Sequence, residues 1–200
     1  MRVIIADAAI GLSPNSWLKD PQIKKYQLQK KRMPLMDGSK HQHLLKNLDK
    51  KKRLDRPDIL HFGLLTILGY QKLIANLEVF FSVPPITYQV DILTRLPRSQ
   101  SRFYGILEKL LAQETTSSFI SPSELKIEEM SCIQFTKKGM SIVPSHFSDY
   151  ENFVFGGFSS GGIRSKFPNA IKVKLSDQPL DLWTALSNFL NQYMVHGLKS

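Results

Sequence analysis

The sequence predicts an α/β fold in which strands and helices alternate along the chain. Val3–Ala6 form a short apolar run that is typical of a buried strand. Leu77–Val83 and Ile86–Leu93 are rich in β-branched and aromatic residues, and with Pro84-Pro85 between them they have the composition of two strands. Helical periodicity appears between and after such runs. Strands that alternate with helices favour an α/β sheet.

Length and composition limit the class of protein. A chain of 200 residues with 42% hydrophobic residues can form one domain with its own core. No apolar run approaches the roughly 20 residues of a membrane span, and Met1–Ile10 is too short for a signal peptide. We expect a soluble, cytoplasmic protein without a membrane segment. The single cysteine, Cys132, excludes a disulfide framework and is expected in the core. We expect no metal site, because His41 and His43 fit surface positions better than ligand positions.

The net charge of +10 is concentrated at about residues 19–56. This segment holds thirteen Lys and Arg against four acids, which leaves it with a charge of +9. Such a concentration is the electrostatic footprint of a polyanion partner, and a solubilising flexible loop is the alternative. Asp37-Gly38 and Lys50–Lys52 predict exposed turns, with an amphipathic piece around residues 44–48 between them.

A buried helix is predicted from about Arg56 to Leu68. Pro57 suits its first position, and apolar residues surround the helix almost completely. Asp58 lies in the first turn, where an acid ordinarily complements the helix dipole. The same carboxylate can instead hold Arg56, or an arginine of the next cluster, in a fixed orientation.

The segment Thr94–Tyr104 sets Arg95, Arg98 and Arg102 at spacings of three and four. The apolar run that follows predicts a helix, which would place the three guanidinium groups on one side. Guanidinium groups recognise phosphate oxygens in a planar, bidentate way, so the cluster points to nucleic acid. A solvated helix face with one or two ion pairs is the alternative.

The remaining elements are assigned in chain order. Leu125–Met130 and Ile133–Thr136 are weaker strand candidates, whereas Phe153–Phe155 and Ala170–Leu175 are clearer ones. A C-terminal helix is predicted from Pro179 onward by its periodic apolar residues.

Two loops at strand ends are the best candidates for a ligand site. Residues 156–162 read G-G-F-S-S-G-G, and glycine lets the backbone approach a ligand closely. This is neither a Walker loop nor the dinucleotide motif, and a flexible hairpin is the alternative. Leu175–Leu180 also follows a strand and leads into a helix. Together the two loops suit a cofactor held largely by main-chain groups.

Four segments in this order resemble the pseudouridine N1-methyltransferases of small-subunit ribosomal RNA, a SPOUT-class family of ribosome biogenesis. They are R-P-D-I-L-H at 56–61, T-R-L-P-R-S-Q-S-R-F at 94–103, F-V-F-G-G-F-S-S-G at 153–161 and L-S-D-Q-P-L at 175–180. The resemblance runs from about Arg56 to the C-terminus and points to a compact, archaeal-type member. It implies one SPOUT methyltransferase domain over residues 1–200, with a basic insertion-like segment and a deep C-terminal trefoil knot, a rare exception among folds.

The resemblance also assigns roles to residues. It implies that Arg56 and Asp58 are catalytic residues near the target base, and that Arg56 and the three arginines of the cluster bind RNA. It places S-adenosylmethionine against the two loops, at Phe155, Gly156, Gly157, Phe158, Ser159, Gly161, Leu175, Ser176, Gln178, Pro179 and Leu180. The implied partners are small-subunit ribosomal RNA, a second copy of the chain and ribosome assembly proteins.

The implied reaction transfers a methyl group from sulfonium to N1 of pseudouridine, with Asp58 orienting the base or accepting its proton. Two other functions remain open. One is a non-catalytic RNA-binding assembly factor with empty loops, and the other is a small-molecule-binding or structural α/β domain. The basic segment and the arginines argue against the second, and only cofactor binding separates the first from the enzyme.

Overall fold

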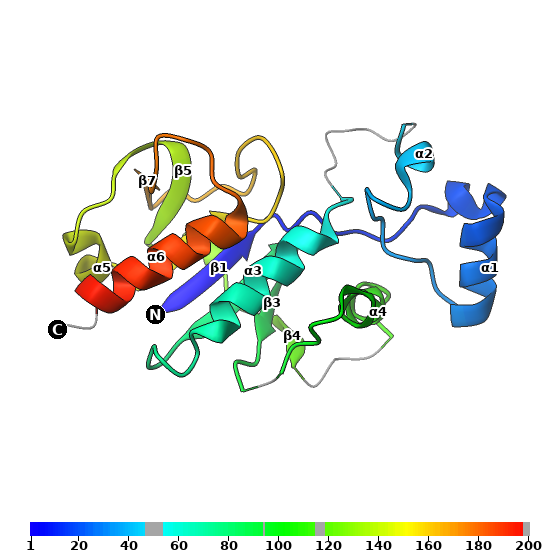
Figure 1. Cartoon of the computed structure of the whole chain (residues 1–200), viewed down its shortest axis with the longest axis horizontal. Helices are drawn as coiled ribbons and strands as arrows, with labels where there is room; N and C mark the ends of the chain where they lie inside the picture. The colour runs from blue at the N-terminus through cyan, green and yellow to red at the C-terminus, as the bar shows by residue number, and fades with distance from the viewer. Residues whose placement is uncertain (47–53, 94, 115–118, 198–200) are drawn as a thin grey trace.

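A computed structural model describes residues 1–46, 54–93, 95–114 and 119–197. The predicted turn at Lys50–Lys52 lies outside these residues. A seven-stranded sheet forms the centre of the described part, in the order β4-β3-β2-β1-β6-β5-β7 (Figure 1). The strands are β1 (Arg2–Ala6), β2 (Glu78–Val83), β3 (Ile86–Val90), β4 (Ile120–Ser123), β5 (Cys132–Ser141), β6 (Asn152–Gly156) and β7 (Ala170–Lys174).

The sheet is mixed, and its parallel part determines where the site can form. β1 pairs in parallel with β2 and β6, and β5 pairs in parallel with β6 and β7. β3 is antiparallel to both β2 and β4. The carboxyl ends of β1, β5, β6 and β7 therefore meet at one edge, which is where α/β sheets commonly bind ligands.

The helices are unequal in length and position. They are α1 (Pro21–Lys30), α2 (Gln42–Leu45), α3 (Pro57–Gly69), α4 (Gln100–Leu111), α5 (Ser145–Asp149) and α6 (Leu182–His196), with 3-10 turns η1 (Asn15–Lys19) and η3 (Ile127–Glu129). α3 and α6 pack side by side across one face of the sheet, whereas α1 lies at the far end of the molecule (Figure 1). No helix in the described residues is long and apolar enough to cross a bilayer.

The main core lies between the sheet and helices α3, α4 and α6. Aromatic rings fill much of it; Phe153 and Phe189, both fully buried, have ring centroids 4.6 Å apart. A smaller cluster covers the opposite face of the sheet and contains Phe80, Val154 and Cys132. Burial raises the pKa of the Cys132 thiol to about 11. The prediction that this cysteine is a core residue is therefore confirmed.

Most of the predicted elements are confirmed. The strands expected near the N-terminus, on both sides of Pro84-Pro85, at 153–155 and at 170–175 are all present, and Ile133–Thr136 is part of β5. The helix predicted to begin at about Arg56 is α3. The C-terminal helix begins at Leu182, three residues after Pro179. Helices α1 and α5 and strand β4 were not anticipated.

Three predictions are wrong in detail. Leu125–Met130 is not a strand; it contains η3, whose fully buried Ile127 packs into the smaller cluster. Asp37 is buried rather than exposed, because its carboxylate accepts hydrogen bonds from the backbone N and side-chain Oγ of Ser39. The third wrong prediction is the helix that would place Arg95, Arg98 and Arg102 on one side. The helix in this segment, α4, begins only at Gln100. Pro97 disfavours helical backbone at the residue before it.

Candidate functional site

The two predicted ligand loops line one cavity of about 560 Å³, within the size range of small-molecule sites. One loop follows β6 and the other follows β7, and β5 pairs in parallel with both strands. The sheet therefore brings together two segments that are about 20 residues apart in sequence. Besides the loops, the lining includes Gln134, Phe135, Thr136, Lys137, Lys138, Lys172, Leu182 and Ala185.

All but one of the predicted cofactor residues line this cavity; the exception is Gly157. The backbone N of Gly157 donates to the Ala6 carbonyl at 2.7 Å, and its own carbonyl accepts from Ala9 N at 2.8 Å. A Cβ atom at Gly157 would lie 2.7 Å from Cγ2 of Ile5 and 2.8 Å from Cα of Ala8. Gly157 thus permits the loop to pack closely on the end of β1, and a larger residue there would disturb this packing before it reached a ligand.

Two other glycines shape the loop for different reasons. Gly161 has a φ of 86°, in the left-handed region that favours glycine. A Cβ atom at Gly156 would lie 2.5 Å from Cζ of Phe158, whose side chain lines the cavity. The glycine content of the loop therefore reflects backbone geometry and close packing, and does not fit the alternative of an unconstrained hairpin.

Asp7 holds the far end of the glycine loop, and sequence reasoning missed it. Its carboxylate accepts hydrogen bonds from the backbone N of Arg164, from the backbone N of Ser165 at 3.1 Å and from Ser165 Oγ at 2.6 Å. The backbone N of Asp7 donates to Ser82 Oγ at 3.0 Å. Asp7 therefore joins the ends of β1 and β2 to the loop. The sequence feature that could have identified Asp7 is its position directly after a buried strand, at the edge of the sheet where ligand loops lie.

Arg56 and Asp58 form a bidentate pair at the start of α3. Arg56 Nε lies 2.9 Å from Asp58 Oδ1, and Nη2 lies 2.8 Å from Oδ2. This hydrogen bonding raises the pKa of Arg56, and the nearby carboxylate of Asp181 adds to the effect. Asp181 stands between two cavity-lining residues, Leu180 and Leu182, so the pair lies near the cavity. Of the two partners expected for Asp58, the structure selects Arg56.

The three arginines of the predicted RNA-binding cluster do not share a helix face. Arg95 and Arg98 lie in the segment before α4, and only Arg102 is helical. All three are exposed and form no ion pair with the described residues, so the alternative of an ion-paired helix face is not supported. His61 of α3 anchors their segment, because its Nε2 donates to the Pro97 carbonyl at 2.7 Å.

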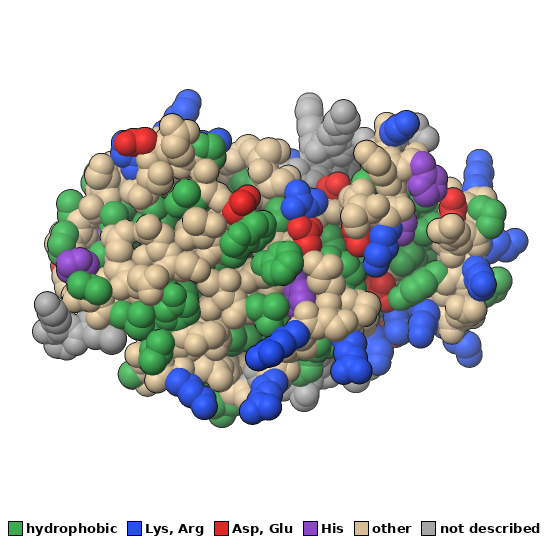
Figure 2. Space-filling model, in the orientation of Figure 1, with side chains coloured by type: hydrophobic (Ala, Val, Ile, Leu, Met, Phe, Trp, Pro, Cys, Tyr) green, Lys and Arg blue, Asp and Glu red, His purple; other side chains and the backbone are tan. Residues whose placement is uncertain are grey.

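The basic segment is folded wherever the structure describes it. Glu108 of α4 holds it in place by accepting hydrogen bonds from Tyr26 of α1 at 2.6 Å and from the backbone N of Leu35 at 3.1 Å. Arg32 forms ion pairs with Glu108 and Glu114. Figure 2 shows Lys and Arg side chains gathered along the lower right edge, over α4 and α1. The flexible-loop alternative is therefore not supported for residues 19–46.

The two histidines of this segment make protein contacts. His43 Nε2 lies 3.1 Å from an Asp20 carboxylate oxygen, and His41 Nδ1 accepts from Asp37 N at 3.1 Å. His43 is exposed, whereas His41 is only partly so. Within the described residues, no group of three or more His, Cys, Asp or Glu is placed to hold a metal ion.

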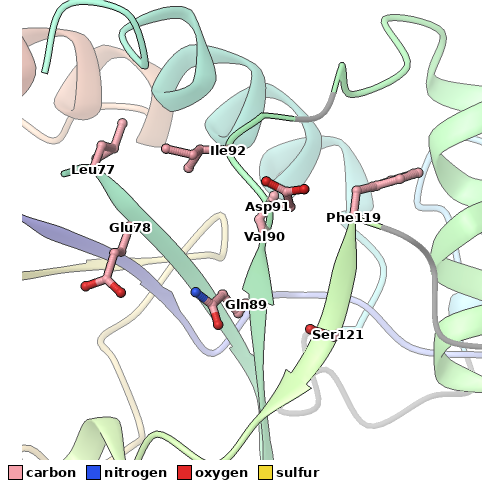
Figure 3. A pocket seen from close by; sticks show the side chains of 8 residues that line it. All are labelled: Leu77, Glu78, Gln89, Val90, Asp91, Ile92, Phe119 and Ser121. Carbon is pink, nitrogen blue, oxygen red and sulfur yellow. The ribbon is translucent and has the colours of Figure 1, made fainter. Parts of the chain in front are cut away.

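A second cavity of about 390 Å³ lies at the start of β2, away from both loops (Figure 3). Two acids line it, but both are engaged in the fold. Glu78 pairs with Arg2 at 2.7 Å, and Asp91 accepts from the backbone N of Leu93 at 2.9 Å. The cavity at the loop edge, with its glycine backbone and its neighbouring Arg–Asp pair, is therefore the candidate site.

Known proteins are similar to this chain in sequence and in fold. Residues 3–194 match the sequence model of a family described as EMG1/NEP1 methyltransferase. The protein named ribosomal RNA small subunit methyltransferase Nep1 from Pyrococcus furiosus is 30% identical, over 96% of both chains. Its counterpart from Thermococcus kodakarensis is also 30% identical, over 95% of this chain and 96% of that relative. The crystal structure of Archaeoglobus fulgidus Nep1 bound to S-adenosylhomocysteine superposes with a TM-score of 0.83, at 22% identity over 96% of each chain.

Proposed function

The chain belongs to the EMG1/NEP1 methyltransferase family, and from this membership we propose that it methylates small-subunit ribosomal RNA with S-adenosylmethionine as methyl donor. The target atom is N1 of a pseudouridine, and the reaction is a step in ribosome biogenesis. The observation that carries the proposal is the cavity between the loops after β6 and β7, with the Arg56–Asp58 pair beside it. The names of the curated relatives agree with this activity.

The residues around the cavity fit S-adenosylmethionine. The lining includes Gly156, Gly161 and Ser176 together with the apolar residues Phe158 and Leu180. Such a lining offers hydrogen-bonding groups for the polar ends of the cofactor and apolar surface for its adenine. When bound, the cofactor supplies a methyl group activated by sulfonium. The loops would orient this group, and well-aligned reactants can gain about 7–11 kcal/mol toward the barrier.

Asp58 and Arg56 act on the target base. N1 of pseudouridine carries a proton that must leave as the nitrogen is methylated. The Asp58 carboxylate accepts this proton or orients the base, while the Arg56 guanidinium stabilises the negative charge that develops. The bidentate contact supports this division of roles, because it fixes both side chains at the head of a buried helix.

The RNA lies across the basic surface. The exposed guanidinium groups of Arg95, Arg98 and Arg102 bind phosphates, and the +9 segment at about residues 19–56 extends the surface. The anchoring of both regions on α3 and α4, through His61 and Glu108, supports a preformed binding surface.

Several finer features belong to the same proposal. The C-terminal loops are threaded as a trefoil knot, the chain forms a homodimer, and it works in the cytoplasm on ribosome precursors, together with assembly proteins. The TM-score of 0.83 to a family structure supports the fold. An exposed apolar side chain, Phe62, beside the partly exposed Trp183 supports a protein contact at the start of α3 and α6.

Calorimetry combined with a transfer assay tests the proposal. S-adenosylmethionine and S-adenosylhomocysteine should both give heats of binding, and methyl should reach a pseudouridine-containing stem-loop but not the same stem-loop with uridine. If RNA binds normally while neither cofactor gives heat at millimolar concentration, the chain is an RNA-binding assembly factor and the enzyme proposal is wrong.

A further inference from the structure

The cofactor cavity has a strongly one-sided charge. Lys137 and Lys138 of β5 and Lys172 of β7 line it, and no Asp or Glu is part of the described lining. All three lysines are exposed and form no ion pair with the described residues. The neighbouring Lys174 behaves differently, because it pairs with Asp177 at 2.6 Å and does not line the cavity. We call Lys137, Lys138 and Lys172 the lysine rim.

Such a rim is a poor match for the cofactor alone. The reactive sulfur of S-adenosylmethionine is positively charged, and like charges repel, although water and salt weaken the repulsion between exposed groups. S-adenosylmethionine also carries one carboxylate, but its net charge is positive, and three cations in a described lining without an acid outnumber that carboxylate. A further anion beside the lysines would offset the repulsion. The other reactant can supply that anion, because an RNA strand carries a phosphate at every nucleotide.

We propose that the lysine rim binds phosphates of the RNA substrate next to the target nucleotide. This inference rests on the proposed function, which identifies the cavity as the cofactor site. Lysine is a common phosphate ligand that acts as a point charge. Phosphates bound at the rim also offset its positive charge, so RNA and S-adenosylmethionine favour each other's binding. S-adenosylhomocysteine, whose sulfur is neutral, lacks this coupling.

The position of the rim gives the RNA a second contact surface. β5 and β7 lie on the opposite side of α3 from α4, which carries Arg102 (Figure 1). Figure 2 shows a small separate group of Lys and Arg side chains over β5 and β7, at the upper left, with an acidic side chain beside them. A strand that presents its base near the Arg56–Asp58 pair would therefore be held on one side by the arginines and on the other by the rim.

The test compares a rim variant with the wild-type protein in two binding assays. Lys137→Gln, Lys138→Gln and Lys172→Gln are combined, and RNA affinity is measured over a salt series. Each lost phosphate contact on single-stranded RNA lowers the slope of log affinity against log salt by about 0.7, so the slope should fall by about 2. Lys72→Gln, which changes an exposed lysine of the α3–β2 connection, should leave the slope unchanged.

Cofactor binding without RNA is the second assay. We expect the triple variant to bind S-adenosylmethionine about two- to fivefold more tightly than the wild type, since a partly screened repulsion is removed. Affinity for S-adenosylhomocysteine should stay the same. If the triple variant does not fold, the single variant Lys172→Gln replaces it in the salt series, where the slope should change by about 0.7.

An unchanged salt slope in the folded rim variants would overturn the inference. If these variants also lose affinity for both cofactors, the rim is instead a site for the cofactor carboxylate. A wild-type protein that binds neither cofactor would refute the proposed function instead, and the salt slope would still decide whether the rim contacts RNA.

Discussion

At the scale of single residues, the Arg56–Asp58 pair has a geometry that separates two roles for Asp58. A carboxylate that only complements the helix dipole needs no partner, yet Asp58 receives two hydrogen bonds from one guanidinium group. Arg56 is thereby fixed, while the pair stays partly accessible to solvent. An acid in this arrangement can serve a reacting base and still contribute to the start of α3.

Asp58→Asn should separate catalysis from RNA binding. Because the variant keeps the arginines that we propose to bind phosphates, RNA affinity should change little. The single-turnover rate should fall by about 10²–10⁴-fold if Asp58 is a general base, and by less if it only orients Arg56. Asp55→Asn is the control, since Asp55 also raises the pKa of Arg56 but does not hydrogen-bond to it. A large drop in melting temperature with normal turnover in the folded fraction would make Asp58 a structural residue.

The glycine loop offers a second prediction at this scale. Gly161→Ala places a Cβ at a positive φ, which costs about 1–2 kcal/mol. If that cost falls on the loop conformation that binds the cofactor, affinity for S-adenosylhomocysteine should fall about 5- to 30-fold. Gly69→Ala is the control, because a Cβ there has no described protein atom within 4 Å and no positive φ, and Gly69 ends α3 without lining the cavity. Equal affinities for the two variants, measured by calorimetry, would show that the φ of Gly161 does not govern the site.

At the scale of elements, α3 connects the core to the segment that carries Arg95 and Arg98 through His61. The ring is fully buried, stacks on Phe103 with centroids 4.6 Å apart and donates to Pro97. Its Nδ1 has no hydrogen-bond partner among the described residues. Burial lowers the pKa of His61, although the bond to Pro97 opposes this. The neutral ring thus holds the segment that carries Arg95 and Arg98.

Replacing His61 should change both pH stability and RNA binding. In the folded protein the pKa lies below its ordinary value of about 6.5, so the unfolded chain binds more protons at low pH. The contribution of neutral His61 to the free energy of unfolding is fully present above about pH 6.5. It declines as the pH falls below that value. His61→Phe should therefore reduce the loss of melting temperature between neutral and mildly acidic pH.

The same variant frees the Pro97 carbonyl, so RNA affinity should weaken. His61→Gln retains a donor and should restore part of that affinity. If both variants bind RNA like the wild type over a salt series, His61 does not position the arginines.

The arginine segment also shows what sequence reasoning can and cannot predict. The residue types correctly indicated exposed groups suited to phosphate, because their chemistry does not depend on backbone shape. The prediction of one helix face was wrong, because Pro97 disfavours helical backbone at Leu96 and the extended Ser99 precedes the start of α4 at Gln100. Similarly, the loop at 156–162 was identified from its glycines and its place after a strand, and the loop at 175–180 from its place between a strand and a helix; both line one cavity. Asp7 was missed because its contact with Ser165 joins residues 158 positions apart, which no local pattern encodes.

At the scale of the whole molecule, alternation of strands and helices predicted the class of fold but not the strand order. The order places β1 between β2 and β6, so the first strand becomes the centre of the sheet. Such an arrangement depends on which apolar faces pack together over long sequence separations. The positions of the two loops at strand ends gave the expectation that they hold one ligand, and the resemblance of four motifs added only the identity of that ligand.

The last prediction concerns the homodimer. Phe62 is 41% exposed and packs edge-on against Trp183, with ring centroids 5.5 Å apart, where α3 and α6 begin. If two copies associate through this surface, sedimentation at micromolar concentration should give a mass near twice 22.8 kDa. Phe62→Glu should shift the mass to that of the monomer, because it would bury a charge in the interface.

Leu28→Glu is the control: Leu28 is 67% exposed on α1, far from this surface, and its replacement should leave the dimer intact. A wild-type protein that sediments as a monomer would remove the homodimer from the proposal. A dimer that persists in Phe62→Glu would instead place the interface elsewhere on the molecule.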